Sequence, residues 1–191
     1  MVFFDFLEKL MNVNIDKADI ASVKKMLTGI KNGTPKALTQ ALNKTTKTMK
    51  TQIKARLGNE LNLTAARIEK DLRIIKASYN NLNGGVVASG QPVGLTQFKA
   101  TQTKKGVKVK TKKAGTKKLI KHAFIQHGRN QNLHVFWRKG KERYEIHAKH
   151  GPRIEDILAS PKVLEPIQIQ AAHIFPQNVL KAVDDILKRF G

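Results

Sequence analysis

The spacing of apolar residues changes at Leu72, and this change constrains the fold more than any other feature of the sequence. Before it, apolar side chains from Ile20 to Ile30 recur every three or four residues, which is typical of one helical face. After it, short apolar segments such as residues 84–90 and 106–110 are separated by turns rich in glycine, proline and asparagine. The sequence therefore predicts an α+β fold in which helices precede a run of antiparallel strands.

The expected architecture is a set of N-terminal helices, an antiparallel β-sandwich or barrel, and a C-terminal helix. Helices are expected over residues 16–31, 34–57 and 64–71, with a last one from about Ala171 or Gln177 to Phe190. Strands are expected over residues 73–77, 84–90, 95–98, 106–110, 123–126, 133–137 and 143–148. The corresponding parts are a mainly helical residues 1–78, a β part in residues 79–170, and the helix in residues 171–191.

Positive charge is concentrated in one part of the chain. The 191 residues carry a formal net charge of +22, from 36 Lys and Arg against 14 Asp and Glu. Residues 99–153 hold seventeen basic residues against Glu142 and Glu145, a net charge of +15, whereas residues 154–191 are close to neutral. A local field of this size favours an anionic partner, either a nucleic acid or an acidic protein surface.

The lysines around the expected strand at residues 106–110 are the candidate contact surface. In that strand valine alternates with lysine, so the valines should face a core and the lysines solvent. Lysine is a flexible point charge that suits phosphates and carboxylates but reads base edges poorly. The contact residues are expected to be Lys104, Lys105, Lys108, Lys110, Lys112, Lys113, Lys117 and Lys118. A solvated strand whose lysines discourage aggregation is the alternative.

The basic helices within residues 36–72 suggest a second function, a DNA-binding helix-turn-helix regulator. A helix opening at Thr64 after a short turn is compatible with that motif, but Glu69 and Asp71 would repel phosphates. Ordinary helix packing is the competing explanation.

Nothing in the sequence predicts an enzyme or a cofactor. The six histidines lack the spacing of a zinc-hydrolase helix, there is no cysteine, and no glycine-rich phosphate loop opens a helix. A nuclease would have to rely on Glu142 or Glu145 within the basic segment. There is no run of about 18 apolar residues and no convincing signal peptide, so we expect no membrane contact and a protein that is made and used without export.

The order of short motifs resembles the phage minor tail protein Z family, the tail-completion proteins of long-tailed phages. The resemblance begins with residues 37–45, which end in Ala41-Leu42-Asn43-Lys44-Thr45 and are similar to the family's A-L-N-x-T helix. It continues through residues 88–98, 102–109 and 123–125 to Gly151-Pro152-Arg153-Ile154, where the family more often has serine in place of the arginine. About residues 36–158 are covered, and the order of the motifs is more specific than any one of them.

The resemblance implies a structural virion protein that completes the tail at its head-proximal end. It implies a homo-oligomeric ring, commonly sixfold, that meets the tail terminator and tail tube proteins. Its anionic partner is either the DNA end, without sequence specificity, or an acidic neighbouring ring. Subunit or neighbour packing is expected to involve an apolar N-terminal segment and the last helix. The residues are Phe3, Phe4, Phe6, Leu7, Val183, Ile186 and Leu187.

Overall fold

The computed structural model describes all residues except 1–8, 13–16, 139, 141–144 and 191. By their contacts the residues form two compact units. Unit 1 comprises residues 1–53, 72–89 and 159–191, and unit 2 comprises residues 54–71 and 90–158. The predicted division into residues 1–78, 79–170 and 171–191 concerns the order of elements along the chain and stays a prediction.

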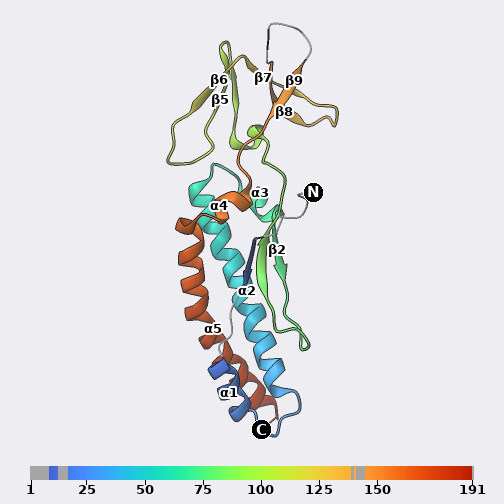
Figure 1. Cartoon of the computed structure of the whole chain (residues 1–191), viewed down its shortest axis with the longest axis vertical. Helices are drawn as coiled ribbons and strands as arrows, with labels where there is room; N and C mark the ends of the chain where they lie inside the picture. The colour runs from blue at the N-terminus through green and yellow to red at the C-terminus, as the bar shows by residue number, and fades with distance from the viewer. Residues whose placement is uncertain (1–8, 13–16, 139, 141–144, 191) are drawn as a thin grey trace, which may run out of the picture. The chain divides into compact units, whose positions relative to one another are not determined.

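Unit 1 combines helices with a small antiparallel sheet (Figure 1). The sheet has the order β1-β3-β2, with Lys9 and Leu72 both paired to Ala88. The central strand β3 is buried at all four positions. The elements of this unit are β1 (Lys9–Asn12), α1 (Lys17–Met26), most of α2 (Gly33–Glu60), β2 (Leu72–Ile75), β3 (Gly85–Ala88) and α5 (Pro161–Phe190).

Helix α5 is longer than the sequence predicted, because it begins at Pro161 rather than near Ala171 or Gln177. Pro166 and Pro176 lie inside it, although an internal proline costs a helix about 3 kcal/mol. Buried side chains recur every three or four residues through both prolines, and their burial offsets that cost. These buried residues are Val163, Ile167, Ala171, Phe175, Asn178, Val179, Ala182, Val183 and Ile186.

Polar side chains of α2 fix both neighbouring elements of unit 1. The buried Asn178 of α5 donates a hydrogen bond from Nδ2 to Oγ1 of Thr45, at 2.9 Å. Asn43 donates from Nδ2 to the Ala77 carbonyl at 3.1 Å and accepts from the Ala77 N–H at 2.9 Å. The A-L-N-x-T segment thus ties α2 to α5 and to the chain just after β2, while Ala41 and Leu42 are fully buried.

Replacing Asn43 by Ala should therefore destabilise the protein by about 1.5 kcal/mol, because both backbone groups of the buried Ala77 lose their partner. Urea denaturation measures the change as a lower midpoint at constant slope. Gln40→Ala, at an exposed position one turn earlier, is the control and should change stability by less than about 0.5 kcal/mol. Equal midpoints for the two variants would contradict this role of Asn43.

Unit 2 holds two three-stranded antiparallel sheets, β4-β5-β6 and β7-β8-β9. His122, between β6 and β7, has a φ of 58°, and this left-handed residue turns the chain from one sheet into the other. The elements are the end of α2, α3 (Ala65–Lys70), η1 (Leu95–Phe98), β4 (Thr101–Thr103), β5 (Gly106–Val109), β6 (Lys118–Lys121), β7 (Ala123–His127), β8 (Leu133–Arg138), β9 (Ile146–Lys149) and α4 (Ile154–Leu158).

The predicted α+β class is confirmed, and for the β part the prediction allowed either a sandwich or a barrel. Among the described residues no sheet closes into a barrel. Residues 95–98 form a 3-10 helix rather than a strand. Leu95 and Phe98 are three residues apart, and a single 3-10 turn brings both into the core, where an extended strand would place them on opposite faces.

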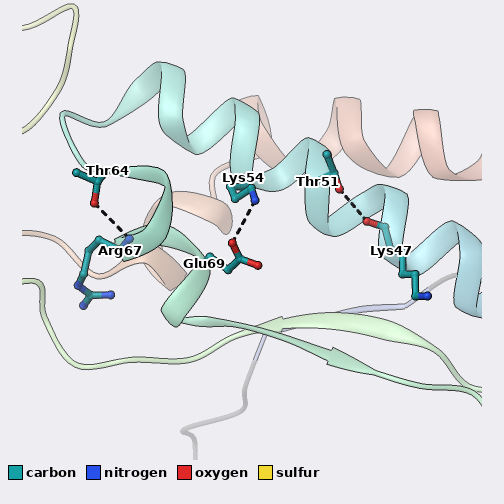
Figure 2. A network of polar contacts seen from close by, with 6 residues as sticks. All are labelled: Lys47, Thr51, Lys54, Thr64, Arg67 and Glu69. Atoms are coloured by element: carbon teal, nitrogen blue, oxygen red, sulfur yellow. Dashed lines mark hydrogen bonds and ion pairs between the residues drawn. The ribbon is translucent and has the colours of Figure 1, made fainter.

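The short helix α3 forms as the sequence predicted (Figure 2). Thr64 caps its start by accepting a hydrogen bond from the Arg67 N–H at 3.3 Å. Lys54, in the last two turns of α2, pairs with Glu69 at 3.1 Å, and Arg67 pairs with the buried Asp71 at 2.7 Å. Helix α2 itself continues past the expected stop at Gly58-Asn59 and ends at Glu60.

Candidate anion-binding surface

Lys104 and Lys105 form the tip of the β4–β5 hairpin in unit 2. Thr103 and Gly106 are the last pair of the hairpin, so the two exposed lysines are the connecting turn. The Thr103 hydroxyl donates to the Gly106 carbonyl at 2.7 Å and holds the turn closed. Two consecutive exposed lysines thus lie at this end of the sheet.

The exposed face of the β4-β5-β6 sheet continues this positive surface. Lys108 in β5 lies opposite Leu119 in β6, and Lys121 is two residues further along the same face. All three side chains are exposed, whereas Val107 and Val109 on the other face are buried. The predicted alternation of buried valine and exposed lysine is confirmed for residues 107–109.

A pocket of about 390 Å³ lies where this hairpin meets the start of β7. Four of its side chains carry or can acquire positive charge, and Leu119 and Phe124 give it an apolar part. Gln102 connects strand β4 to strand β7 at this pocket, because its Oε1 accepts a hydrogen bond from the Ile125 N–H at 2.8 Å. The basic residues of the pocket are Lys104, Lys105, Lys121 and His122.

The remaining predicted lysines lie outside the pocket. Lys110 is half-buried just after β5, and its carbonyl accepts a hydrogen bond from Asn62 at 3.1 Å. Lys112 pairs with Leu61 through an isolated bridge, and the Lys113 N–H donates to the Glu60 carbonyl at 2.9 Å. Lys117 precedes β6 and Lys118 opens it, both exposed. Of the eight predicted lysines, Lys104, Lys105 and Lys108 thus lie on the β4–β5 hairpin, Lys118 opens β6, and the other four lie between β5 and β6.

Lys121 and His122 were missed as contact residues. The sequence did not predict strand β6, because residues 118–121 show neither clear alternation nor a long apolar run. The available signal was the length of residues 111–122, which allows a return strand against β5. Only the pairing of Gly106 with Lys121 shows that both residues sit beside the hairpin turn.

The exposed positive charges of this surface could attract anions as point charges. The ion pairs of Lys54, Arg67 and Lys188 lie elsewhere, and within the described part of the chain no acidic side chain pairs with the four basic residues of the pocket. Because lysine offers no fixed fork of donors, the surface suits phosphate or carboxylate groups without selecting a sequence. No three or more acidic or histidine side chains gather as a metal site among the residues described.

The residues predicted to pack against a neighbouring subunit lie in different environments. Phe3, Phe4, Phe6 and Leu7 lie outside the described residues. Val183 and Ile186 are 4% and 1% exposed and belong to the core of unit 1, so they are not free for a neighbour. Leu187 is 41% exposed, and its role in subunit packing stays a prediction. Beside it, the hydrogen bond and charge of Asp184 raise the pKa of Lys188 above its ordinary value.

Comparison with known protein families identifies one match over nearly the whole chain. A model of the family described as prophage minor tail protein Z (GPZ) matches residues 17–190. Comparisons with curated proteins and with solved structures give no significant match. None of the described helices is long and apolar enough to cross a membrane. The match spans both compact units and includes the lysine hairpin and the Asn43 segment, so the chain belongs to the prophage minor tail protein Z family, whose members are components of the phage tail.

Proposed function

We propose that the protein completes the phage tail at its head-proximal end as a non-enzymatic, ring-forming structural subunit. In that role the lysine surface of unit 2 contacts an anionic neighbour, either an acidic tail or neck protein or the DNA end. The observation that carries the proposal is the set of exposed Lys104, Lys105 and Lys121 that lines a pocket without acidic residues, with Lys108 exposed on the same sheet. A ring repeats this cluster once per subunit and multiplies the field that attracts an anion.

The location in the virion can be tested directly. Antibodies against the chain should label purified tails at the end that joins the head, and purified protein should form an oligomer of defined mass by light scattering. Labelling at the distal tip, or a strictly monomeric protein that is absent from virions, would refute the proposal.

Charge reversal should separate this surface from the general positive charge of the chain. The triple variant Lys104→Glu, Lys105→Glu, Lys121→Glu should bind unrelated DNA duplexes and polyglutamate at least about tenfold more weakly at low salt, and with a smaller salt dependence. The control reverses Lys24, Lys25 and Lys31, which are exposed in unit 1 and change the net charge equally. Equal losses for the two triple variants would show that no localised site exists.

The geometry does not favour the alternative of a helix-turn-helix regulator. Helix α3 has six residues, and its Arg67 is engaged by Asp71 while Glu69 holds Lys54. A recognition helix needs several free side chains near its start to reach base edges. A preference of about a thousandfold for one DNA site over unrelated duplexes would nevertheless restore that function.

A further inference from the structure

A second pocket, in unit 1, has a chemical character that the proposed function does not use. Its volume is about 550 Å³, and its walls come from helix α2 and from the chain that follows β2. The surface lining it is mostly apolar, with basic and hydroxyl groups added. Its lining residues are Thr39, Gln40, Asn43, Lys44, Lys47, Ser78 and Tyr79.

The side chains around this pocket fit a partner that is both aromatic and acidic. Tyr79 is 57% exposed, an unusual degree for a large ring. Lys44 and Lys47 are exposed one helical turn apart, and no ion pair with an acidic residue is found for either among the described residues. The hydroxyl Oγ1 of Thr39 is buried in the wall without a hydrogen-bond partner. A ligand that enters with apolar rings, carboxylates and a polar backbone matches all of these groups.

We propose that this pocket binds residues 2–8 of a second copy of the chain. That segment reads Val-Phe-Phe-Asp-Phe-Leu-Glu, so it offers three phenylalanine rings and the carboxylates of Asp5 and Glu8. The rings fill the apolar part beside Tyr79, and the two carboxylates lie against Lys44 and Lys47. In a chain of net charge +22, few other segments combine acidic and aromatic residues in this way.

The strand register favours a second copy over the same chain. In the sheet, Lys9 lies level with Leu72, whereas Asn12 lies level with Ile75, just before Ser78 and Tyr79. Strand β1 therefore begins at the end of the sheet opposite to Ser78 and Tyr79. From the level of Lys9 to that of Ala77 is about 16 Å. Even when fully extended, the chain from Phe4 to Lys9 spans at most about 17 Å. Reversing its direction uses about two residues, so the segment of the same chain is too short to bring Phe4 back to the pocket.

Disulfide trapping tests the contact cleanly, because the chain contains no cysteine. Two full-length variants, Phe4→Cys and Tyr79→Cys, are mixed and mildly oxidised. We expect a covalent heterodimer at a yield at least about tenfold above that of Phe4→Cys with Gln168→Cys, since docking raises the local concentration of the thiols. Gln168 is exposed on α5 of the same unit. Equal yields for the two pairs would overturn the proposal.

The same design distinguishes the two sources of the segment. A single chain carrying both Phe4→Cys and Tyr79→Cys should give covalent dimers and higher species. A closed monomer as the main product, at all protein concentrations, would overturn docking between copies.

Charge swapping tests the acidic part of the contact. Lys44→Glu with Lys47→Glu in the Tyr79→Cys chain should lower the yield about fivefold, and Asp5→Lys with Glu8→Lys in the Phe4→Cys chain should restore it. No loss, or a loss without rescue, would overturn the charge pairing. Circular dichroism checks that each variant folds.

This inference rests on the proposed self-assembly of the protein. Light scattering on the same samples tests self-assembly separately from the docking site. An oligomer of defined mass that gives no Phe4–Tyr79 link overturns the docking site and leaves ring formation standing. A protein that stays monomeric and gives no link overturns both.

Discussion

Gly106→Ala should destabilise the protein by about 3–5 kcal/mol, the largest effect we expect from a single methyl group. The φ of Gly106 is +139°, and a Cβ atom there would lie 2.1 Å from the Ile120 carbonyl oxygen. That oxygen belongs to the backbone of β6, so the clash can be relieved only by separating β5 from β6. The loss approaches the total stability of an ordinary domain, about 5–15 kcal/mol.

Stability in urea and the binding of anions should therefore be lost together in this variant, because the same strand pair carries the lysine surface. Gly115→Ala is the control. A Cβ atom at Gly115 would meet its nearest neighbour, the Lys112 carbonyl oxygen, at an ordinary 3.5 Å. We expect the control to stay within about 0.5 kcal/mol of the natural protein. A stable Gly106→Ala variant with unchanged binding would contradict the pairing of Gly106 with Lys121.

Asn178→Leu should cost about 2–3 kcal/mol, because it leaves the fully buried hydroxyl of Thr45 without its donor. Thr45→Val should cost less, since the asparagine keeps part of its hydrogen-bonding capacity. The double variant should be more stable than the sum of the single changes predicts, by about 1–2 kcal/mol, because two apolar side chains then face each other.

The four proteins of this cycle are compared by urea denaturation at constant slope. A coupling energy near zero would mean that Thr45 and Asn178 do not interact in solution. The cycle also tests the placement of α5 beside α2, since the two residues are 133 positions apart in sequence.

Local sequence patterns predicted much of the fold. The helical spacing before Leu72, the cap at Thr64 and the valine–lysine alternation at residues 106–110 all correspond to observed elements. Predictions from these features were confirmed because helix capping and strand alternation depend on residues only a few positions away. The start of α5 and the strand β6 were missed because their stability comes from burial and pairing with distant segments.

The candidate sites divide in the same way. Lys104, Lys105 and Lys108 follow from composition and turn position, whereas Lys121 and His122 join them only through the pairing of β6 with β5. The pocket beside Tyr79 has no sequence signature, since it depends on Asn43 holding Ala77 against α2.

By itself the sequence determined the α+β class, the concentration of positive charge in residues 99–153, and the family through the order of its motifs. Net charge and the local spacing of apolar residues are properties of the sequence and do not depend on how the helices and strands pack. Only the tertiary structure decided which lysines share a face, that Val183 and Ile186 belong to the core, and which residues line the pocket beside Tyr79. Those outcomes depend on contacts between residues far apart in sequence, and such contacts are fixed only when the chain packs.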